Sequence, residues 1–292
     1  MADLSPARSG TAAGRPILTA ELLSIGTELT VGETRDTNAG DLARALTGMG
    51  VAVGRITALP DDLDTVTDAV RAAIARADLV LSTGGLGPTP DDLTRESIAA
   101  AVGEDPVVDP QLEGWLREIW ARRGMPFPEM NLKQAWRLPS GQALPNPNGT
   151  APGWWVERAD GGVIVALPGP PREMRPMWAD EVVPRLRQRG VGEDVASRTL
   201  RTAGIGESQV ADLLGEATLR APDPQVATYA RSDAVDVRIS ARGAGADGST
   251  PDARVEAMTE RVATMLAGHV WGEGAATWAD AIGAALVSLH GS

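Results

Sequence analysis

The chain has 292 residues, a net charge of −12, no cysteine and two histidines. Without cysteine it can form no disulfide, thiol nucleophile or cysteine-ligated zinc site. Its acidity argues against non-specific binding to nucleic acid and against docking on an anionic membrane. Because His269 and His290 both lie near the C-terminus, we expect no histidine triad and no histidine-rich metal site. Acid–base or metal chemistry is then left to carboxylates, lysine, hydroxyl groups or water.

The length allows two domains, and an apolar fraction of 43% with a mean hydropathy of −0.11 is ordinary for a globular protein. No stretch approaches the ~20 apolar residues of a membrane span. Residues 1–18 are rich in Ala, Ser, Gly, Pro and Arg and lack an apolar segment, so we expect a disordered leader and not a signal peptide. The lack of cysteine fits a reducing compartment, and we expect a cytoplasmic protein.

The first half of the chain alternates strand and helix patterns. Short apolar runs predict strands at 20–25, 51–59 and 79–83, and helical spacing predicts helices at 39–49 and 63–77. This order is typical of a doubly wound, mostly parallel sheet with helices on both faces. In such α/β folds ligands bind beyond the carboxyl ends of the strands.

A glycine-rich turn, Thr83-Gly-Gly-Leu-Gly-Pro88, follows the third strand and leads to Asp91, Asp92 and a helix at 94–102. Such a strand–turn–helix join can direct backbone N–H groups at an anion, and its three glycines let the main chain approach a ligand. Carboxylates beside a bound phosphate indicate a divalent metal or a general base. The alternative is a simple tight turn in which Asp91 or Asp92 caps the helix.

Two further loops place polar groups at the same predicted edge. Gly26-Thr27-Glu28 follows the first strand and Pro60-Asp61-Asp62 follows the second. Asp36 and Asn38 precede the helix at 39–49, where capping and ligand binding are about equally expected. Polar loops thus follow all three predicted strands at one edge of the sheet, which favours a binding site there over a coincidental grouping of polar residues.

The rest of the first domain, which we bound at 19–190, supplies a second set of loops. A helix is expected at 111–123, followed by strands at 154–156 and 162–167. Lys133, the only lysine, lies in a turn-rich segment and is either solvated or a compact cation for phosphate. Pro168-Gly169 joins the last strand to a helix and again leaves N–H groups at the sheet edge.

Beyond residue 190 the pattern changes to a small α+β domain, bounded at 191–270. Alternation predicts strands at 197–203 and 234–241, and helices are expected at 206–216 and 251–266. Residues 271–292 are expected to be a linker and the first helix of a C-terminal domain that is missing, with that helix at 278–289. The alternative is that this helix packs against the rest of the protein.

Several motifs occur in a fixed order, and in them the chain resembles the N-terminal domain of the CinA (competence/damage-inducible) proteins, itself similar to the MoaB/Mog-type molybdopterin-binding fold. Gly204-Ile-Gly-Glu-Ser208 and the strand at 236–242 resemble the middle domain of the same proteins. The first-domain motifs are Ser24-Ile-Gly-Thr-Glu-Leu-x-x-Gly32, Asp36-Thr-Asn38, Thr83-Gly-Gly-Leu-Gly-Pro-Thr-x-Asp-Asp-Leu-Thr94, Asn131-x-Lys-Gln134, Asn148-Gly-Thr-Ala-Pro-Gly153 and Leu167-Pro-Gly-x-Pro-x-Glu-Met174.

The resemblance implies a pocket made of these motifs. Asp61 and Asp92 match the rim aspartates and would hold a divalent metal (Mg, Mn or Co), and with Lys133 they would be the catalytic residues. The ligand-binding positions would be Thr83, Gly84, Gly85, Gly87, Glu28, Asp36, Asn38, Asn148, Gly149, Thr150, Pro168, Gly169 and Glu173.

The resemblance also implies a function, which is metal-dependent hydrolysis of a nucleotide pyrophosphate, with ADP-ribose giving AMP and ribose 5-phosphate. Deamidation of nicotinamide mononucleotide is not expected, because it belongs to the C-terminal domain of full-length CinA proteins. One alternative is a protein that binds or adenylylates molybdopterin, and another is a non-catalytic nucleotide-binding module. A homo-oligomer, foremost a dimer, is expected, with a small-molecule nucleotide or pterin as the ligand.

Overall fold

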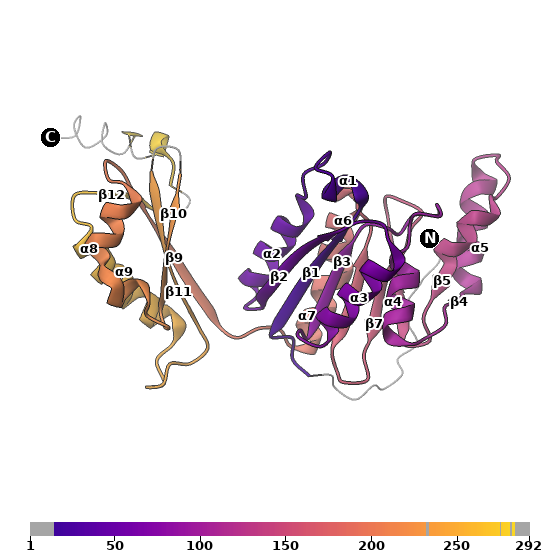
Figure 1. Ribbon diagram of the computed structural model, residues 1–292, viewed down its shortest axis with the longest axis horizontal. Coiled ribbons are helices and arrows are strands. Elements are labelled where there is room, and N and C mark those ends of the chain that lie inside the picture. The colour runs from indigo at the N-terminus through magenta and orange to yellow at the C-terminus, as the bar shows by residue number, and fades with distance from the viewer. Residues whose placement is uncertain (1–14, 232–233, 275, 281, 284–292) are drawn as a thin grey trace. The chain divides into compact units, whose positions relative to one another are not determined.

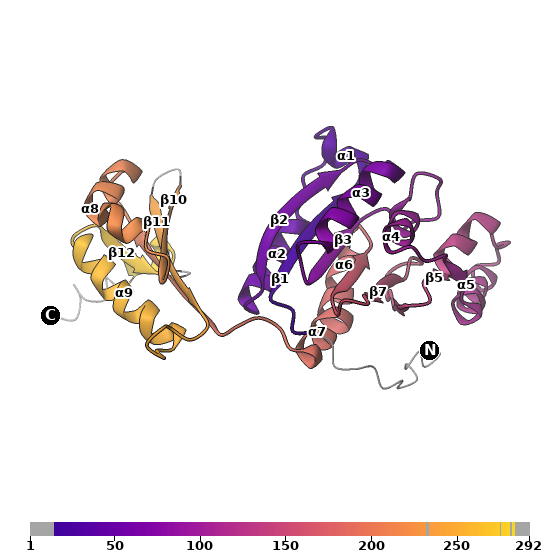
Figure 2. The same cartoon turned by 60° about the horizontal axis from the view of Figure 1, so that its bottom comes forward.

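The computed structural model describes residues 15–231, 234–274, 276–280 and 282–283. The chain divides into two compact units, Met1–Gly192 and Glu193–Ser292, called here the N-terminal and C-terminal units. Each has a sheet and a hydrophobic core of its own (Figures 1 and 2).

The N-terminal unit is built on a six-stranded sheet in the order β2-β1-β3-β8-β7-β6. The first four strands of that order are parallel, and β7 and β6 continue the sheet in antiparallel fashion. The prediction of a mostly parallel sheet is therefore confirmed. The strands are β1 (Thr19–Ile25), β2 (Ala52–Leu59), β3 (Leu79–Thr83), β6 (Gly141–Leu144), β7 (Gly153–Glu157) and β8 (Val163–Leu167).

Helices cover both faces of this sheet, because successive strand side chains point to opposite sides. On β1, Leu22 packs in one hydrophobic cluster and Leu23 in the other. The first cluster contains residues of α2 (Asn38–Gly48), α6 (Pro171–Met177) and α7 (Val183–Arg189), and the second contains residues of α3 (Leu63–Ile74) and α4 (Thr94–Val102). The remaining elements are α1 (Thr27–Thr30), β4 (Val107–Val108), α5 (Pro110–Arg122), η1 (Glu129–Ala135), β5 (Trp136–Arg137) and the π-helical turn η2 (Trp178–Val182).

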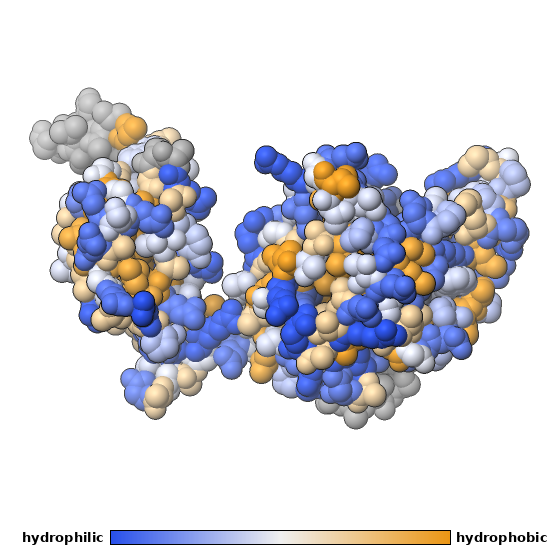
Figure 3. Space-filling view, viewed as in Figure 1, coloured by the Kyte–Doolittle hydropathy of each residue, from blue (hydrophilic) through white to orange (hydrophobic). Residues whose placement is uncertain are grey.

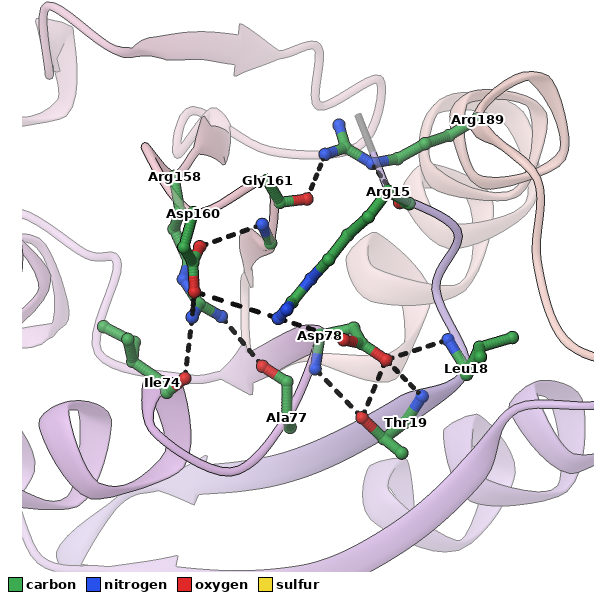
Figure 4. A network of polar contacts seen from close by, with 11 residues as sticks. Arg15, Leu18, Thr19, Ile74, Ala77, Asp78, Arg158, Asp160, Gly161 and Arg189 are labelled. Carbon is green, nitrogen blue, oxygen red and sulfur yellow. Dashed lines mark hydrogen bonds and ion pairs between the residues drawn. The ribbon is translucent and has the colours of Figure 1, made fainter. Parts of the chain in front are cut away.

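The described fold begins before the predicted start of the first domain. Ile17 is fully buried and forms a bridge with Val191. Asp78 accepts hydrogen bonds from the backbone N–H groups of Leu18 and Thr19 at 3.0 and 2.9 Å and pairs with Arg15 at 3.0 Å (Figure 4). The predicted leader, residues 1–18, therefore extends too far at its C-terminal end, because the partner that brings Ile17 into the core, Val191, is distant in the sequence. Residues 1–14 lie outside the described part of the chain.

The carboxyl ends of the parallel strands meet at one edge. Ile25 pairs with Leu59 in the sheet, and Thr83 pairs with both Ser24 and Leu167. The chain leaves β1 for β2 on one side and later returns to β3 on the other, so β1 and β3 flank the switch point where open α/β sheets bind ligands. The loops after β1, β2, β3 and β8 all begin at this edge.

The C-terminal unit is a four-stranded antiparallel sheet in the order β10-β11-β9-β12, with its core shared with α8 and α9. The α+β prediction is confirmed, whereas β10 and β12 were not predicted, since neither shows a clear alternation of apolar residues. Its elements are β9 (Val195–Thr202), α8 (Glu207–Leu219), β10 (Gln225–Ala230), β11 (Val235–Arg242), α9 (Pro251–Met265) and β12 (Val270–Glu273).

Because β12 pairs with β9, this unit continues past the predicted boundary at residue 270. Most of the helix expected at 278–289 lies outside the described residues. Among the described helices, none is both long and apolar enough to cross a membrane. The face shown in Figure 3 is mostly hydrophilic, with hydrophobic residues in small patches.

Candidate functional site

A cavity of about 680 Å³ opens at the carboxyl edge of the N-terminal sheet. It is lined by the loops after β1, β2, β3 and β8, by the segment before β7 and by the end of α5. The structure brings together in its wall every predicted site residue except Lys133, namely Asp61, Asp92, Thr83, Gly84, Gly85, Gly87, Glu28, Asp36, Asn38, Asn148, Gly149, Thr150, Pro168, Gly169 and Glu173.

The glycines of the turn after β3 are required by the chain itself. Gly84 has a φ of +97°, and a Cβ placed there would lie 2.0 Å from the Ile25 carbonyl oxygen. At Gly85, where φ is +62°, a Cβ would meet the Thr94 hydroxyl at 2.3 Å. The turn is thus packed directly against the end of β1 and the start of α4, which fixes its backbone beside the cavity.

Asp92 holds this turn in shape. Its carboxylate accepts hydrogen bonds from the backbone N–H groups of Gly87 and Thr89, both at 2.9 Å, and from the Thr89 hydroxyl. The N-cap position of α4 is Leu93, without a side-chain hydrogen bond. The alternative in which Asp91 or Asp92 caps the helix is therefore wrong, because the Asp92 carboxylate is directed back into the turn.

The same contacts decide which backbone N–H groups can meet a ligand. Gly84 donates to the Leu167 carbonyl at 3.0 Å and Gly87 donates to Asp92. Within the described part of the chain, the N–H groups of Gly85 and Leu86 have no acceptor. The anion cradle expected over the whole turn is therefore reduced to these two donors.

The loops after β1 and β2 are joined to each other and to α2. Asp61 accepts from the Thr27 N–H at 2.7 Å and returns a bond from its own N–H to the Thr27 hydroxyl at 3.1 Å. Asp36 accepts from the Ala39 N–H at 3.0 Å and so caps the first turn of α2. Its second oxygen accepts from the Ser24 hydroxyl at the end of β1.

Asn38 is buried and joins the first loop to the loop after β8. Its Nδ2 donates to the Gly169 carbonyl at 2.7 Å, while its Oδ1 is buried and has no partner among the described residues. An unpaired buried acceptor is costly, so a hydrogen-bond donor on a ligand would have a ready partner here.

The segment before β7 is fixed against α6. Asn146 donates to Glu173 at 2.8 Å and to the Ala151 carbonyl at 3.0 Å. Asn148 donates to the Arg172 carbonyl at 2.8 Å. At Gly149 a Cβ would lie 2.2 Å from the Glu173 carboxylate, so this loop is closely packed against that side chain.

Arg95 connects the two halves of the site and was not among the residues predicted from the sequence. This fully buried guanidinium donates to the Leu86 carbonyl at 2.8 Å and to the Pro152 carbonyl at 3.0 Å. Burial lowers the pKa of Arg95 to about 10, so it remains charged at neutral pH. A basic residue on the first turn of a helix was the only signal in the sequence.

Lys133 lies behind the glycine turn and not in the cavity wall. Its Nζ pairs with Glu96 at 2.7 Å and donates to the backbone carbonyls of Asp92 and Thr89, the latter at 3.5 Å. The structure therefore does not bring this predicted catalytic residue together with the others. Arg123 and Gln134 line the cavity instead and were not predicted to do so.

The carboxylates of the cavity fit a divalent ion only when other ligands complete its coordination. Asp61 and Asp92 each use oxygens for N–H groups but keep spare lone pairs. In the described residues, no group of three or more His, Cys, Asp or Glu side chains is placed to hold a metal. Two carboxylates suit Mg²⁺ and similar ions, which take their remaining ligands from water and phosphate oxygens.

Comparison with known proteins identifies the family. Residues 21–188 match the family model described as probable molybdopterin binding domain, and residues 197–272 match the one described as damage-inducible protein CinA KH domain. The chain belongs to the CinA family. A CinA-like protein of Deinococcus deserti is 51% identical over 93% of this chain, and one of Deinococcus radiodurans is 49% identical over 91%.

This chain spans 66% of the length of each of these two relatives. A solved structure of protein CinA from Thermoplasma acidophilum, described as of unknown function, is 35% identical with a TM-score of 0.52. It covers 55% of this chain and 94% of its own. The family and the fold expected from the sequence motifs are thus confirmed.

Proposed function

We propose that this CinA-family chain hydrolyses a nucleotide pyrophosphate with the help of a divalent metal, and that ADP-ribose is cleaved to AMP and ribose 5-phosphate. The observation that supports this proposal is the wall of the cavity. Two unpaired backbone N–H groups, of Gly85 and Leu86, lie on the same wall as Asp61 and Asp92. Donors for phosphate oxygens and ligands for a metal are thus present in one cavity.

The residues would act in distinct ways. Gly85 and Leu86 would donate to an oxygen of the phosphoanhydride, where negative charge increases during cleavage. Asp61 and Asp92 would hold the ion, whose chemistry is to neutralise phosphate charge and to lower the pKa of a bound water. Asn38 would accept a hydrogen bond from a hydroxyl or amino group of the substrate through its unpaired Oδ1.

The first experiment is product analysis of the purified chain with ADP-ribose, with and without Mg²⁺, Mn²⁺ or Co²⁺. We expect AMP only when metal is present, and we expect EDTA to abolish its formation. AMP formed equally in EDTA would contradict the metal-dependent reaction. A folded chain that forms no AMP with any of the three ions would contradict hydrolysis altogether.

Molybdopterin binding is the second candidate, favoured by the match of residues 21–188 to the probable molybdopterin binding domain. It would use the same cavity without cleaving a phosphoanhydride. Titration with molybdopterin and with AMP distinguishes a molybdopterin-binding protein from a non-catalytic nucleotide-binding module, because only the molybdopterin-binding protein should bind the pterin.

We also propose that the chain forms a dimer, an expectation that comes from the family resemblance. Light scattering should give twice the monomer mass of 30.4 kDa. A mass of 30.4 kDa at the concentrations used for activity would contradict it.

A further inference from the structure

The ammonium group of Lys133 has no donor left for a phosphate. A lysine has three N–H donors, and in Lys133 they face three acceptors, which are Glu96 Oε1 and the carbonyls of Asp92 and Thr89. The side chain is only 11% exposed. Lys133 therefore fixes the segment that carries Asp92, and any side-chain cation for the anionic part of a ligand has to come from another residue.

The cavity needs such a cation because its wall is acidic. Six carboxylates and three arginines line it. Arg172 is 80% exposed and lies 3.8 Å from Glu173, so its charge is partly compensated. Neither Arg35 nor Arg123 forms an ion pair or a side-chain hydrogen bond with any described residue, although carboxylates are abundant around them.

Arg123 differs from Arg35 in being held in position. It directly follows α5, and its N–H donates to the carbonyls of Ile119 and Trp120. Its guanidinium lies over the Trp120 ring, 5.6 Å from the ring centre. Trp120 is itself buried and packs edge-to-face on Phe127 at 5.7 Å. A cation stacked on a fixed aromatic ring keeps its N–H edge available for an anion.

We propose that Arg123 binds the second phosphate of a nucleoside diphosphate group whose first phosphate lies at the Gly85 and Leu86 N–H groups. This inference rests on the proposed function, because it requires a nucleotide pyrophosphate in the cavity. The planar guanidinium can donate two parallel hydrogen bonds to phosphate oxygens. Lys133, for which the sequence left phosphate binding open, is a positioning residue for the loop of Asp92.

The test compares binding of ADP and AMP to the full chain, measured by calorimetry without metal. The variants are Arg123→Gln, Arg35→Gln, Lys133→Met and, as the matched control, Arg122→Gln, which changes a neighbouring arginine outside the cavity wall. We expect Arg123→Gln to weaken ADP binding by about 10- to 100-fold, as for loss of charge-assisted hydrogen bonds. AMP binding should change by less than about threefold, and Arg122→Gln should change neither.

The outcomes separate this inference from the proposed function. If the wild-type chain binds neither nucleotide without metal, the role of Arg123 is overturned, whereas the proposed function is overturned only if no AMP forms from ADP-ribose with metal present. If it binds ADP more tightly than AMP and Arg123→Gln keeps that preference, only the role of Arg123 is overturned. A loss of the preference in Lys133→Met or Arg35→Gln but not in Arg123→Gln would assign the second phosphate to that other cation. Equal weakening of ADP and AMP by Lys133→Met would support its positioning role.

Discussion

Asp92 combines a structural and a proposed chemical role in one side chain. Its two oxygens keep the glycine turn closed through Gly87 and Thr89, and the residue lines the cavity together with Asp61. Asp61 has a single backbone bond to its carboxylate, from Thr27. The two aspartates should therefore respond differently to the same substitution.

We expect Asp92→Asn to lower both the melting temperature and kcat for ADP-ribose, because the new amide N–H₂ opposes an N–H donor of the turn. Both Asp92→Asn and Asp61→Asn should lower kcat by about 100-fold or more, but Asp61→Asn should change the melting temperature less. Asp64→Asn, on the exposed side of α3, is the control. Full kcat in both cavity variants with metal present would contradict the carboxylate–metal proposal.

Arg95 gives a prediction about the stability of the fold. Arg95→Met removes both bonds to Leu86 and Pro152 and leaves two carbonyls without donors, which should lower the free energy of unfolding by about 2 kcal/mol. Arg71→Met is the matched control, because Arg71 also donates to a carbonyl, that of Ala100 at 3.0 Å, but is exposed. Chemical denaturation measures both, and equal effects would contradict a special role for the buried group.

At the scale of elements, the join between β3 and α4 shows how backbone conformation determines the site. Gly84 and Gly32 both have positive φ, +97° and +81°. A Cβ at Gly84 meets the Ile25 carbonyl, whereas at Gly32 nothing lies within 4 Å. Substituting Gly32 therefore measures the cost of backbone strain alone, whereas substituting Gly84 measures strain together with steric contact.

We expect Gly32→Ala to destabilise the chain by about 1 kcal/mol, the cost of strain alone. Gly84→Ala should cost on the order of 3 kcal/mol or more, because the strand and the turn must also move apart. Denaturation midpoints measure the difference. Similar costs at the two positions would show that the turn is not packed against β1 as described.

The start of α3 predicts a pH dependence. Asp62 caps this helix by accepting from the Thr65 N–H at 2.9 Å, and hydrogen bonding from the side chain and the backbone of Thr65 lowers the pKa of Asp62. A lowered folded-state pKa means that the stabilisation is complete above the unfolded value, about 3.9, and is lost as pH falls through the folded value. Asp62→Ala should thus lower the melting temperature at pH 7 but have progressively less effect below about pH 4. An undiminished effect at pH 2 would contradict the capping interaction.

At the scale of the whole molecule, the chain consists of two units with separate sheets and separate cores. All residues that line the cavity belong to the N-terminal unit, between Ile25 and Glu173. The C-terminal half, residues 193–292, carries 14 acidic and 8 basic side chains. This excess of acidic side chains is part of the reason for predicting that nucleic acid is not a partner.

We expect residues 1–192 expressed alone to bind ADP with an affinity within about threefold of the full chain, since the cavity and the cores beneath it are retained. Calorimetry on the two proteins measures this. A loss of tenfold or more, with the shortened chain still folded, would show that the C-terminal unit contributes to the site.

The sequence alone determined the elements that depend on local patterns. Strand and helix periodicity predicted β1, β2, β3 and β8 with their helices. Ordered motifs identified the family, and half of the residues that line the cavity were among the predicted site residues. These features are readable because apolar spacing and glycine turns are local consequences of chain geometry.

Only the tertiary structure decided how individual polar groups are used. Lys133 forms an ion pair with Glu96 and donates hydrogen bonds to two carbonyls. Arg95 joins two loops, at Leu86 and Pro152, that are 66 residues apart. Arg123 lines the cavity from the end of α5. Ile17 enters the core by pairing with Val191. Such partners are distant in sequence, and a long polar side chain has the same local pattern whether it meets solvent, a carbonyl or a ligand.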